Sequence, residues 1–515
     1  MLGLPVDNDK NKNQRHRTLI FQGGGALGAY EVGIYKALYD NLIEKSLDEN
    51  RHLFDIVAGT SAGAINATLI VNHVIQNKDK FNPWDGSAET LYQFWHDVST
   101  HTWYFENLFI KTWQQYSSFF RDQINKVCKP VLKEFDNSFN NIREKSSYLP
   151  FYYLWPDMYG NLATHESFRR YWSWFQFAIL PLGIPNVLSP GIIHPDYRFL
   201  NPFNFIIRFD NTPLTRSIGK YWNDEEYPIK TTEGQPRLLL VAVDVQDATT
   251  VTFDSYGKKG NKLMSFYGDD ETKEKHIIQY NDGIKMEHLL TTMSSHLRYR
   301  FPELNVTTAI VDENSTIPKD IGRPRPFMDG FYLSNTPLRE VLQAHRDYWY
   351  KVKGFNENIP SLDIFIGDLY PTKEKGTPED PDSINNRVQN ILYHDKSKYD
   401  EKVAVMISDY IYIIRSLMKM ANEKGISDRE LYDKLNTELK NKIHSKDRKG
   451  ETRHIHDLID GRVTINYIKR IEYGEGQHIN DSDDIYGKAF DFSTTTIKNL
   501  IQQGYNDTLI KCKFK

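Results

Sequence analysis

Cysteine is scarce in this chain, which has two cysteines, Cys128 and Cys512, in 515 residues. Two cysteines so far apart exclude a disulfide framework and argue against a cysteine-based metal site. Such scarcity is typical of proteins that work in a reducing cytosol. We therefore expect a cytoplasmic protein without a metal site.

An excess of charge of one sign is also missing. The chain has 64 Lys and Arg against 68 Asp and Glu, which gives a net charge of −4. Nucleic-acid-binding domains usually carry a basic patch, so we expect no nucleic-acid partner. Apolar residues make up 39% and charged residues 26% of the chain. This composition is typical of a globular protein with a sizeable core.

No hydrophobic run reaches the ~18 residues needed to span a bilayer. The nearest is FQFAILPLGIPNVL, residues 175–188, which two prolines interrupt. The polar N-terminus lacks the apolar segment of a secretory signal, and we expect a disordered lead-in over residues 1–16. Any contact with a membrane should therefore be peripheral.

Two strand–turn–helix units follow one another in the first 80 residues. The apolar run TLIF, residues 18–21, leads into QGGGALG and a helical pattern over 29–47. The run FDIVAG, residues 54–59, leads into TSAG and a second helical pattern over 64–76. Strands that alternate with helices predict an α/β fold with parallel strands.

Residues 80–235 do not continue this alternation of strands and helices, and they are rich in Trp, Tyr, Phe, Asn and Pro. We expect them to form an inserted cap, either a lid or membrane-resting surface or a second packing layer. The cap would lie within a catalytic domain of residues 17–370, and a mostly helical C-terminal region would follow over 371–515. Further expected helices are 87–98, 113–135, 284–295, 337–348, 384–423, 427–445 and 493–507, and further strands are 237–245 and 362–366, with an alternating stretch at 462–473.

The segment Gly59-Thr60-Ser61-Ala62-Gly63 matches the G-x-S-x-G nucleophile elbow. In this motif a serine sits on a sharp turn between a strand and a helix. Its neighbours at −2 and +2 must be very small, because the strand and helix backbones crowd together there. The pentapeptide alone is a weak signal, but FDIVA before it and an apolar helix after it supply the required context. Ser61 is therefore our candidate nucleophile.

The glycine-rich loop between the first strand and helix has two interpretations. Gly23, Gly25 and Gly28 satisfy the dinucleotide fingerprint G-x-G-x-x-G, but the next strand ends without the carboxylate that would bind a ribose. Alternatively, the amides of Gly23, Gly24, Gly25 and Gly28 form an oxyanion hole. Such donors stabilise a transition state by ~2.7–4 kcal/mol each. The second interpretation fits a serine nucleophile. A third, purely structural interpretation is a tight strand–helix turn that binds no ligand.

A serine nucleophile needs a base. Asp329, followed by Gly330, is one candidate carboxylate, although an Asp-Gly pair most often marks only a turn. Asp244, at the end of an apolar run, is its rival. No histidine stands in a strand-end context typical of a catalytic triad, and His454 and His456 do not suggest a metal site. The histidines considered are His288, His296, His345, His394, His444, His454, His456 and His478.

The segments GGGALG, GTSAG and DG followed by SNTP stand in an order that resembles the patatin-like phospholipase family. The resemblance implies that Ser61 attacks an acyl ester, that Asp329 is its general base, and that Gly23, Gly24, Gly25 and Gly28 form the oxyanion loop, with support from Gly59, Gly63 and Gly330. Asn335 and Pro337 match the N-x-P that often follows the aspartate. Leu27 stands where many members have Arg or Lys, and Phe331 stands where D-G-G has its last glycine.

The motifs cover residues 17–340, and the C-terminal part resembles an extra region of a bacterial subgroup linked with phospholipids and polyhydroxybutyrate. The implied fold is a three-layer α/β/α core with a mainly parallel sheet. The implied activity is cofactor-free cleavage of lipid esters through an acyl-enzyme, as in phospholipase A or lysophospholipase. The alternatives are an intracellular polyester depolymerase, a nucleotide-binding protein and a non-catalytic scaffold. The expected partner is a lipid or polyester ester, reached by peripheral contact with a membrane, lipid surface or polymer granule.

Overall fold

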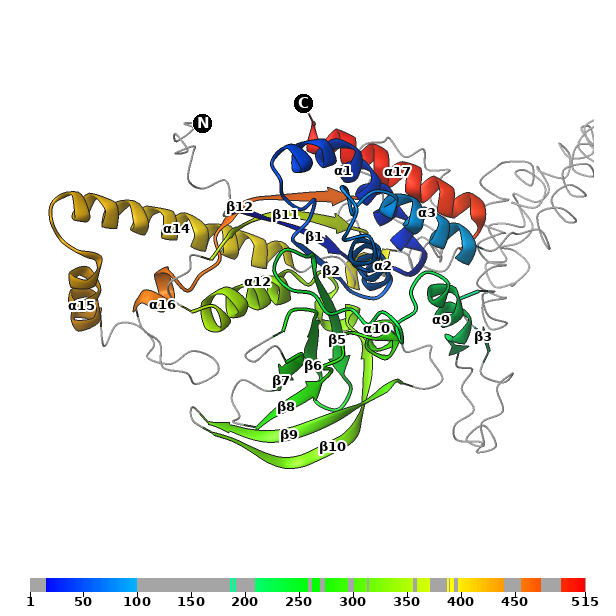
Figure 1. Cartoon of the computed structure of the whole chain (residues 1–515), viewed down its shortest axis with the longest axis horizontal. Coiled ribbons are helices and arrows are strands. Elements are labelled where there is room, and N and C mark those ends of the chain that lie inside the picture. Colours follow the sequence, from blue (N-terminus) through cyan, green and yellow to red (C-terminus); the bar gives the residue numbers. More distant parts are fainter. Residues whose placement is uncertain are drawn as a thin grey trace, which may run out of the picture.

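The protein is an α/β structure built on one large mixed sheet, with helices on both faces of its parallel half (Figure 1). The computed structural model describes residues 15–99, 186–187, 189–190, 209–257, 262–268, 274–294, 301–312, 315–354, 359–370, 387–388, 390–392, 397–439, 455–473 and 492–514. Within these residues, no helix is long and apolar enough to cross a membrane.

Half of the sheet is parallel. Its strands, in spatial order, are β12 (Ile465–Glu472), β11 (Ser361–Asp368), β1 (Arg15–Phe21), β2 (Ile56–Gly59) and β5 (Arg237–Asp244). Every residue of β5, with the sequence RLLLVAVD, is buried. A continuous apolar run of this kind is typical of a strand that is covered on both faces.

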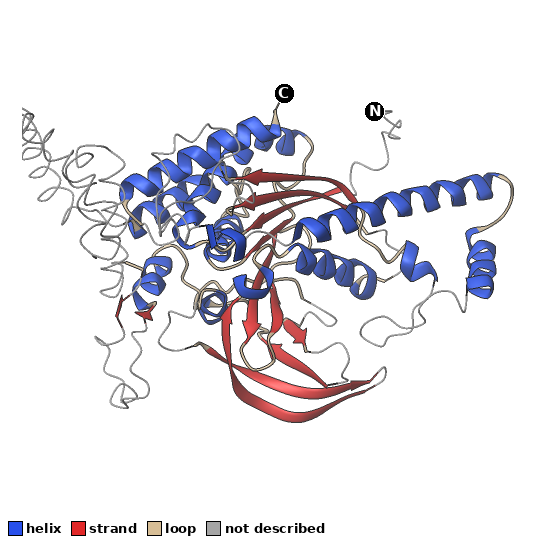
Figure 2. Ribbon diagram, turned by 180° about the vertical axis from the view of Figure 1, so that it is seen from behind, coloured by secondary structure: helices blue, strands red, loops and turns tan. Residues whose placement is uncertain are grey.

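The other half is antiparallel and curves away from the parallel strands (Figure 2). It continues from β5 through β10 (Ser315–Asp329), β9 (Glu303–Asp312), β8 (Glu274–Gln279) and β7 (Met264–Tyr267), while β6 (Thr249–Asp254) pairs with β5. A separate short pair joins β3 (Ser189–Pro190) and β4 (Phe209–Asp210). No strands were expected from the sequence in the stretch from β6 to β10.

Helices form the outer layers. They are α1 (Gly28–Asp48), α2 (Ala62–Gln76), α3 (Ser87–Val98), α9 (Thr212–Gly219), α10 (Met286–Thr292), α11 (Phe331–Ser334), α12 (Leu338–Arg346), α14 (Ser397–Glu423), α15 (Asp428–Leu439), α16 (Ile455–Ile459) and α17 (Thr494–Cys512), with a 3₁₀ turn η2 (Gly25–Leu27) and a π-helical turn η10 (Asp347–Val352). Alternation along β1 separates two cores: Leu19 and Phe21 face one and Ile20 faces the other.

The larger core lies under α1, α2, α3 and α17. The smaller core contains Leu338 and Val341 of α12, and Ala404 of α14 packs against it. These two cores, on opposite faces of the parallel strands, confirm the expected three-layer α/β/α arrangement.

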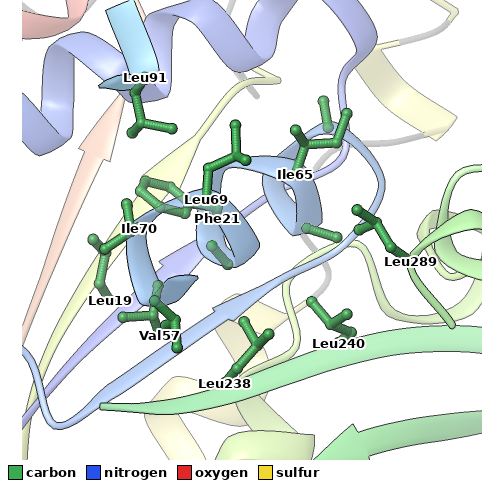
Figure 3. Close-up of a cluster of buried hydrophobic side chains, with 14 of the residues drawn as sticks. Leu19, Phe21, Val57, Ile65, Leu69, Ile70, Leu91, Leu238, Leu240 and Leu289 are labelled. Atoms are coloured by element: carbon green, nitrogen blue, oxygen red, sulfur yellow. The ribbon is translucent and has the colours of Figure 1, made fainter. Parts of the chain in front are cut away.

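Helix α2 fills the centre of the larger core. Figure 3 shows Ile65, Leu69 and Ile70 lying between the side chains of the sheet and Leu91 of α3. The sheet contributes Leu19, Phe21, Val57, Leu238 and Leu240. These apolar contacts fix α2, and therefore its first turn, against the ends of β1 and β2.

Two of the expected regions fall partly within the described residues. Helix α3, at the start of the expected cap, packs into the larger core, whereas residues 100–185 and 191–208 lie outside the described residues. The expected lead-in lies mostly outside them too, and β1 already begins at Arg15.

The described part of the C-terminal region packs against the α/β unit. Strand β12 pairs in parallel with β11, and α17 packs against α1. The two helices approach so closely that a Cβ added to Gly33 would lie 2.0 Å from the carbonyl oxygen of Ile501. A Cβ at Gly504 would likewise lie 2.0 Å from the carbonyl oxygen of Tyr30. The last described helix therefore completes the core of the α/β unit.

This close approach predicts that Gly33→Ala will destabilise the protein. The new methyl group would meet the backbone of α17, and overpacking of this kind costs about 1–3 kcal/mol. Chemical unfolding should therefore show a lower free energy of unfolding. Gly219→Ala is the matched control, because a Cβ there meets nothing within 4 Å. Equal stability of the two variants would contradict the prediction.

Candidate active site

Ser61 occupies the sharp turn between β2 and α2, at the N-cap of α2. Its backbone has φ 55° and ψ −123°, a conformation that non-glycine residues rarely adopt. A Cβ on Gly59 would lie 2.2 Å from the carbonyl oxygen of Gly63, and a Cβ on Gly63 would lie 2.6 Å from that of Gln22. Both glycines are therefore required by the turn, for the reason the G-x-S-x-G spacing indicated. The helix N-terminus also places positive potential beside Ser61.

Asp329 is the last residue of β10, and it pairs with Ala242 of β5. Its side chain is buried, with 2% of its surface exposed. The Ser61 hydroxyl lies close enough to this carboxylate to lower its pKa. The Phe331 amide donates a hydrogen bond to Asp329 Oδ1 at 3.1 Å. The structure thus brings together two side chains that lie far apart in the sequence.

Burial raises the pKa of Asp329 to about 7, and the Ser61 hydroxyl and the hydrogen bond from Phe331 only partly offset this rise. A carboxylate in water has a pKa near 4 and is too weak a base to accept a proton from a serine readily. Loss of solvation makes this one more basic. Gly330 permits the position, because a Cβ there would lie 2.3 Å from the carbonyl oxygen of Val241.

The glycine loop lies directly beside Ser61. A Cβ on Gly23 would be 2.8 Å from Ser61 Cβ. A Cβ on Gly24 would be 2.6 Å from Leu369 Cδ1, so the loop is enclosed on that side as well. Gly25 has φ 57°, which favours glycine. Glycine is therefore needed along this loop for close approach and for backbone conformation.

The four glycines do not share one role. The Gly23 amide donates to Asn335 Oδ1 at 2.8 Å. The Gly28 amide donates to the carbonyl oxygens of Gly25 and Ala26 within the turn. A Cβ on Gly28 would lie 2.6 Å from the ring of Trp95, so Gly28 allows close packing. Among the described residues, the Gly24 and Gly25 amides have no hydrogen-bond acceptor, and these two fit the role of oxyanion donors.

Asp244, the rival carboxylate, serves another purpose. Arg325 donates to both of its oxygens, at 2.7 and 3.0 Å, and the Tyr267 hydroxyl donates at 2.7 Å. Burial opposes its charge, but these hydrogen bonds outweigh that effect and hold the pKa of Asp244 below its usual range. A carboxylate so firmly paired is a poor proton acceptor.

The candidate histidines that the structure describes also interact with other groups. His345 is buried and bonds to the carbonyl oxygen of Pro360, and His288 accepts from the Lys285 amide. Burial lowers the pKa of His288 to about 4. His456 lies beside Asp457. His296, His394, His444, His454 and His478 lie outside the described residues. No group of three or more His, Cys, Asp or Glu side chains in the described ranges could hold a metal ion.

Sequence reasoning gave no role to Gln22, which is fully buried at the end of β1. Its Nε2 donates to Thr336 Oγ1 at 2.6 Å, and its Oε1 accepts from the Leu369 amide at 2.8 Å. Its own amide donates to the buried Glu31 at 2.6 Å. Gln22 thus connects the ends of β1 and β11 with the segment after Asp329. No motif or spacing marks such a residue, because the partners of its side chain are more than 300 residues away.

Comparison with known proteins gives a family for part of the chain. A sequence model described as patatin-like phospholipase matches residues 19–181. No curated protein matches the chain. The crystal structure of VipD from Legionella pneumophila aligns with 97% of this chain and 67% of that chain, at 10% identity and a TM-score of 0.27, a likeness too weak to carry an argument.

The matched range includes the glycine loop and Ser61, whereas Asp329 lies beyond it. A match to this family supports lipid ester hydrolysis as the general class of activity. Over residues 19–181, the chain is thus similar to the patatin-like phospholipase family.

Proposed function

We propose that this protein hydrolyses carboxylic ester bonds of lipids with Ser61 as nucleophile and Asp329 as general base. The observation that carries the proposal is the position of the Ser61 hydroxyl beside the buried Asp329 carboxylate, where it lowers the pKa of that carboxyl group. The strained turn at Ser61 and the glycine amides beside it add further support.

The first half of the reaction acylates the enzyme. Asp329 takes the proton of Ser61 as Oγ forms a bond to the ester carbonyl carbon. The amides of Gly24 and Gly25 donate to the oxyanion of the tetrahedral intermediate. When the intermediate collapses, the bond to the alcohol oxygen breaks, and Asp329 returns its proton to the departing alcohol.

The second half releases the acid. Asp329 takes a proton from a water molecule, whose oxygen attacks the acyl carbon. The bond to Ser61 Oγ then breaks, and Asp329 gives the proton back to Ser61. The enzyme is regenerated without a cofactor, and the two products are an alcohol and a carboxylic acid.

Lipid is the proposed substrate because the family match names phospholipases. Purified protein should be incubated with a defined phospholipid, a lysophospholipid and a short hydroxybutyrate oligomer. We expect fatty acid release from one or both lipids. Release of acid from the oligomer alone would show a polyester depolymerase instead.

Replacement of the nucleophile gives a direct test. We expect Ser61→Ala to lower the rate of ester hydrolysis by at least ~10³-fold, because the attacking oxygen is lost. Labelling by a fluorophosphonate probe should disappear as well. Ser416→Ala is the matched control, since the exposed Ser416 hydroxyl donates to the carbonyl oxygen of Tyr412 within α14. Full activity or labelling in Ser61→Ala would refute the proposal.

The pKa of Asp329 predicts how activity depends on pH. Asp329 accepts a proton only when ionised, so kcat/KM should fall as pH drops through its pKa of about 7. A rate profile from pH 5 to 9 should rise to a plateau with a midpoint near that value. Asp329→Asn, which keeps the shape but removes the base, should be ~10²–10⁴-fold slower than the wild-type plateau. A flat profile between pH 5 and 8 would argue against Asp329 as the base.

A further inference from the structure

The segment that follows Asp329 contacts both of the other parts of the active site. Asn335 Oδ1 accepts from the Gly23 amide at 2.8 Å, and Thr336 Oγ1 accepts from Gln22 Nε2 at 2.6 Å. The carbonyl oxygen of Ser334 accepts from Thr60 Oγ1 at 3.0 Å. Three hydrogen bonds thus tie this segment to the glycine loop and to the nucleophile turn.

Two of these hydrogen bonds join adjacent residues of the glycine loop to adjacent residues of the segment after Asp329. Gln22 and Gly23 stand at the start of the glycine loop, and they bond to Thr336 and Asn335 respectively. The side chains of Gln22, Asn335 and Thr336 expose 0%, 8% and 5% of their surface. Because buried hydrogen bonds are poorly replaced by water, they hold their geometry more firmly than exposed ones.

We infer that Asn335 is a positioning residue for the oxyanion loop and that Thr336, through Gln22, is its second point of attachment. The inference rests on the proposed function. Asn335 fixes the Gly23 amide away from the substrate and so sets where the Gly24 and Gly25 amides stand relative to Ser61. Gly23 is then the anchor of the loop rather than an oxyanion donor.

The chemistry of an asparagine suits this position. A Cβ on Gly23 would lie 3.0 Å from Asn335 Oδ1 and 2.8 Å from Ser61 Cβ, so the amide oxygen of Asn335 is close to the reacting centre. A carboxylate could accept the same hydrogen bond, but its charge would repel the developing oxyanion. A neutral acceptor fixes the loop without that penalty.

Asn335→Ala tests the first attachment. We expect kcat for a soluble short-chain ester to fall about 10- to 100-fold, because small displacements of catalytic groups have effects of this size. KM should stay within about twofold, and the pH midpoint should stay in place, because Asp329 keeps its contacts with Ser61 and the Phe331 amide.

Asn72→Ala is the matched control. Asn72 is also buried, lies on α2, and donates one hydrogen bond to the carbonyl oxygen of Tyr221 at 3.2 Å. Its loss should lower the melting temperature without changing kcat of the folded enzyme. A general loss of stability would affect both variants alike, whereas a positioning role affects kcat in Asn335→Ala alone.

Thr336 offers a conservative pair for the second attachment. Thr336→Val keeps the shape but removes the oxygen that accepts from Gln22, and we expect kcat to fall about 3- to 30-fold. Thr336→Ser keeps that oxygen and should retain a kcat close to wild type. This pair decides the inference even if Asn335→Ala does not fold.

The outcomes separate the inference from the proposed function. A wild-type protein that hydrolyses esters, together with an Asn335→Ala variant of equal or higher kcat, would overturn the inference, because the Gly23 amide would then be a usable donor. Equal kcat in Thr336→Val and Thr336→Ser would overturn the role of Thr336. A wild-type protein that cleaves no ester and takes up no fluorophosphonate would instead refute the proposed function.

Discussion

The contact between the Ser61 hydroxyl and the Asp329 carboxylate is the interaction on which the rest of the site depends. Removing a carboxylate from water is unfavourable, and here that cost appears as a raised pKa. The same burial makes the carboxylate a stronger base. A surface Asp-Ser pair would keep a low pKa and would gain little, so the fold must enclose Asp329 while leaving Ser61 partly accessible.

The sheet brings Asp329 to Ser61 by combining parallel and antiparallel strands. The ends of parallel strands β1, β2 and β11 lie together and carry the glycine loop, Ser61 and Leu369. Strand β10 approaches β5 antiparallel and pairs with it over Phe327, Met328 and Asp329. Asp329 pairs with Ala242 of β5. Two residues earlier in β5, Leu240 pairs with Gly59, so this short pairing places Asp329 near the nucleophile turn.

Much of this arrangement could be predicted from the sequence, because local patterns produced it. Apolar runs, flanking glycines and helical periodicity indicated β1, β2, α1, α2 and the turn at Ser61. The antiparallel half was not predicted, since prolines such as Pro318 and Pro324 within β10 read as strand breakers. Hydrogen bonds such as Gly23 to Asn335 join residues 312 positions apart, and no local pattern encodes them.

The contact between α1 and α17 also bears on how the molecule is made. Gly33 and Gly504 meet across the two helices although hundreds of residues separate them in the chain. A ribosome adds about 5–20 residues per second, so α1 waits for roughly tens of seconds before α17 can cover it. During this time, the face of α1 that packs against α17 in the folded protein lacks its partner. The scaffold that supports Ser61 becomes complete only after α17 has emerged, so hydrolytic competence should be acquired late in biogenesis.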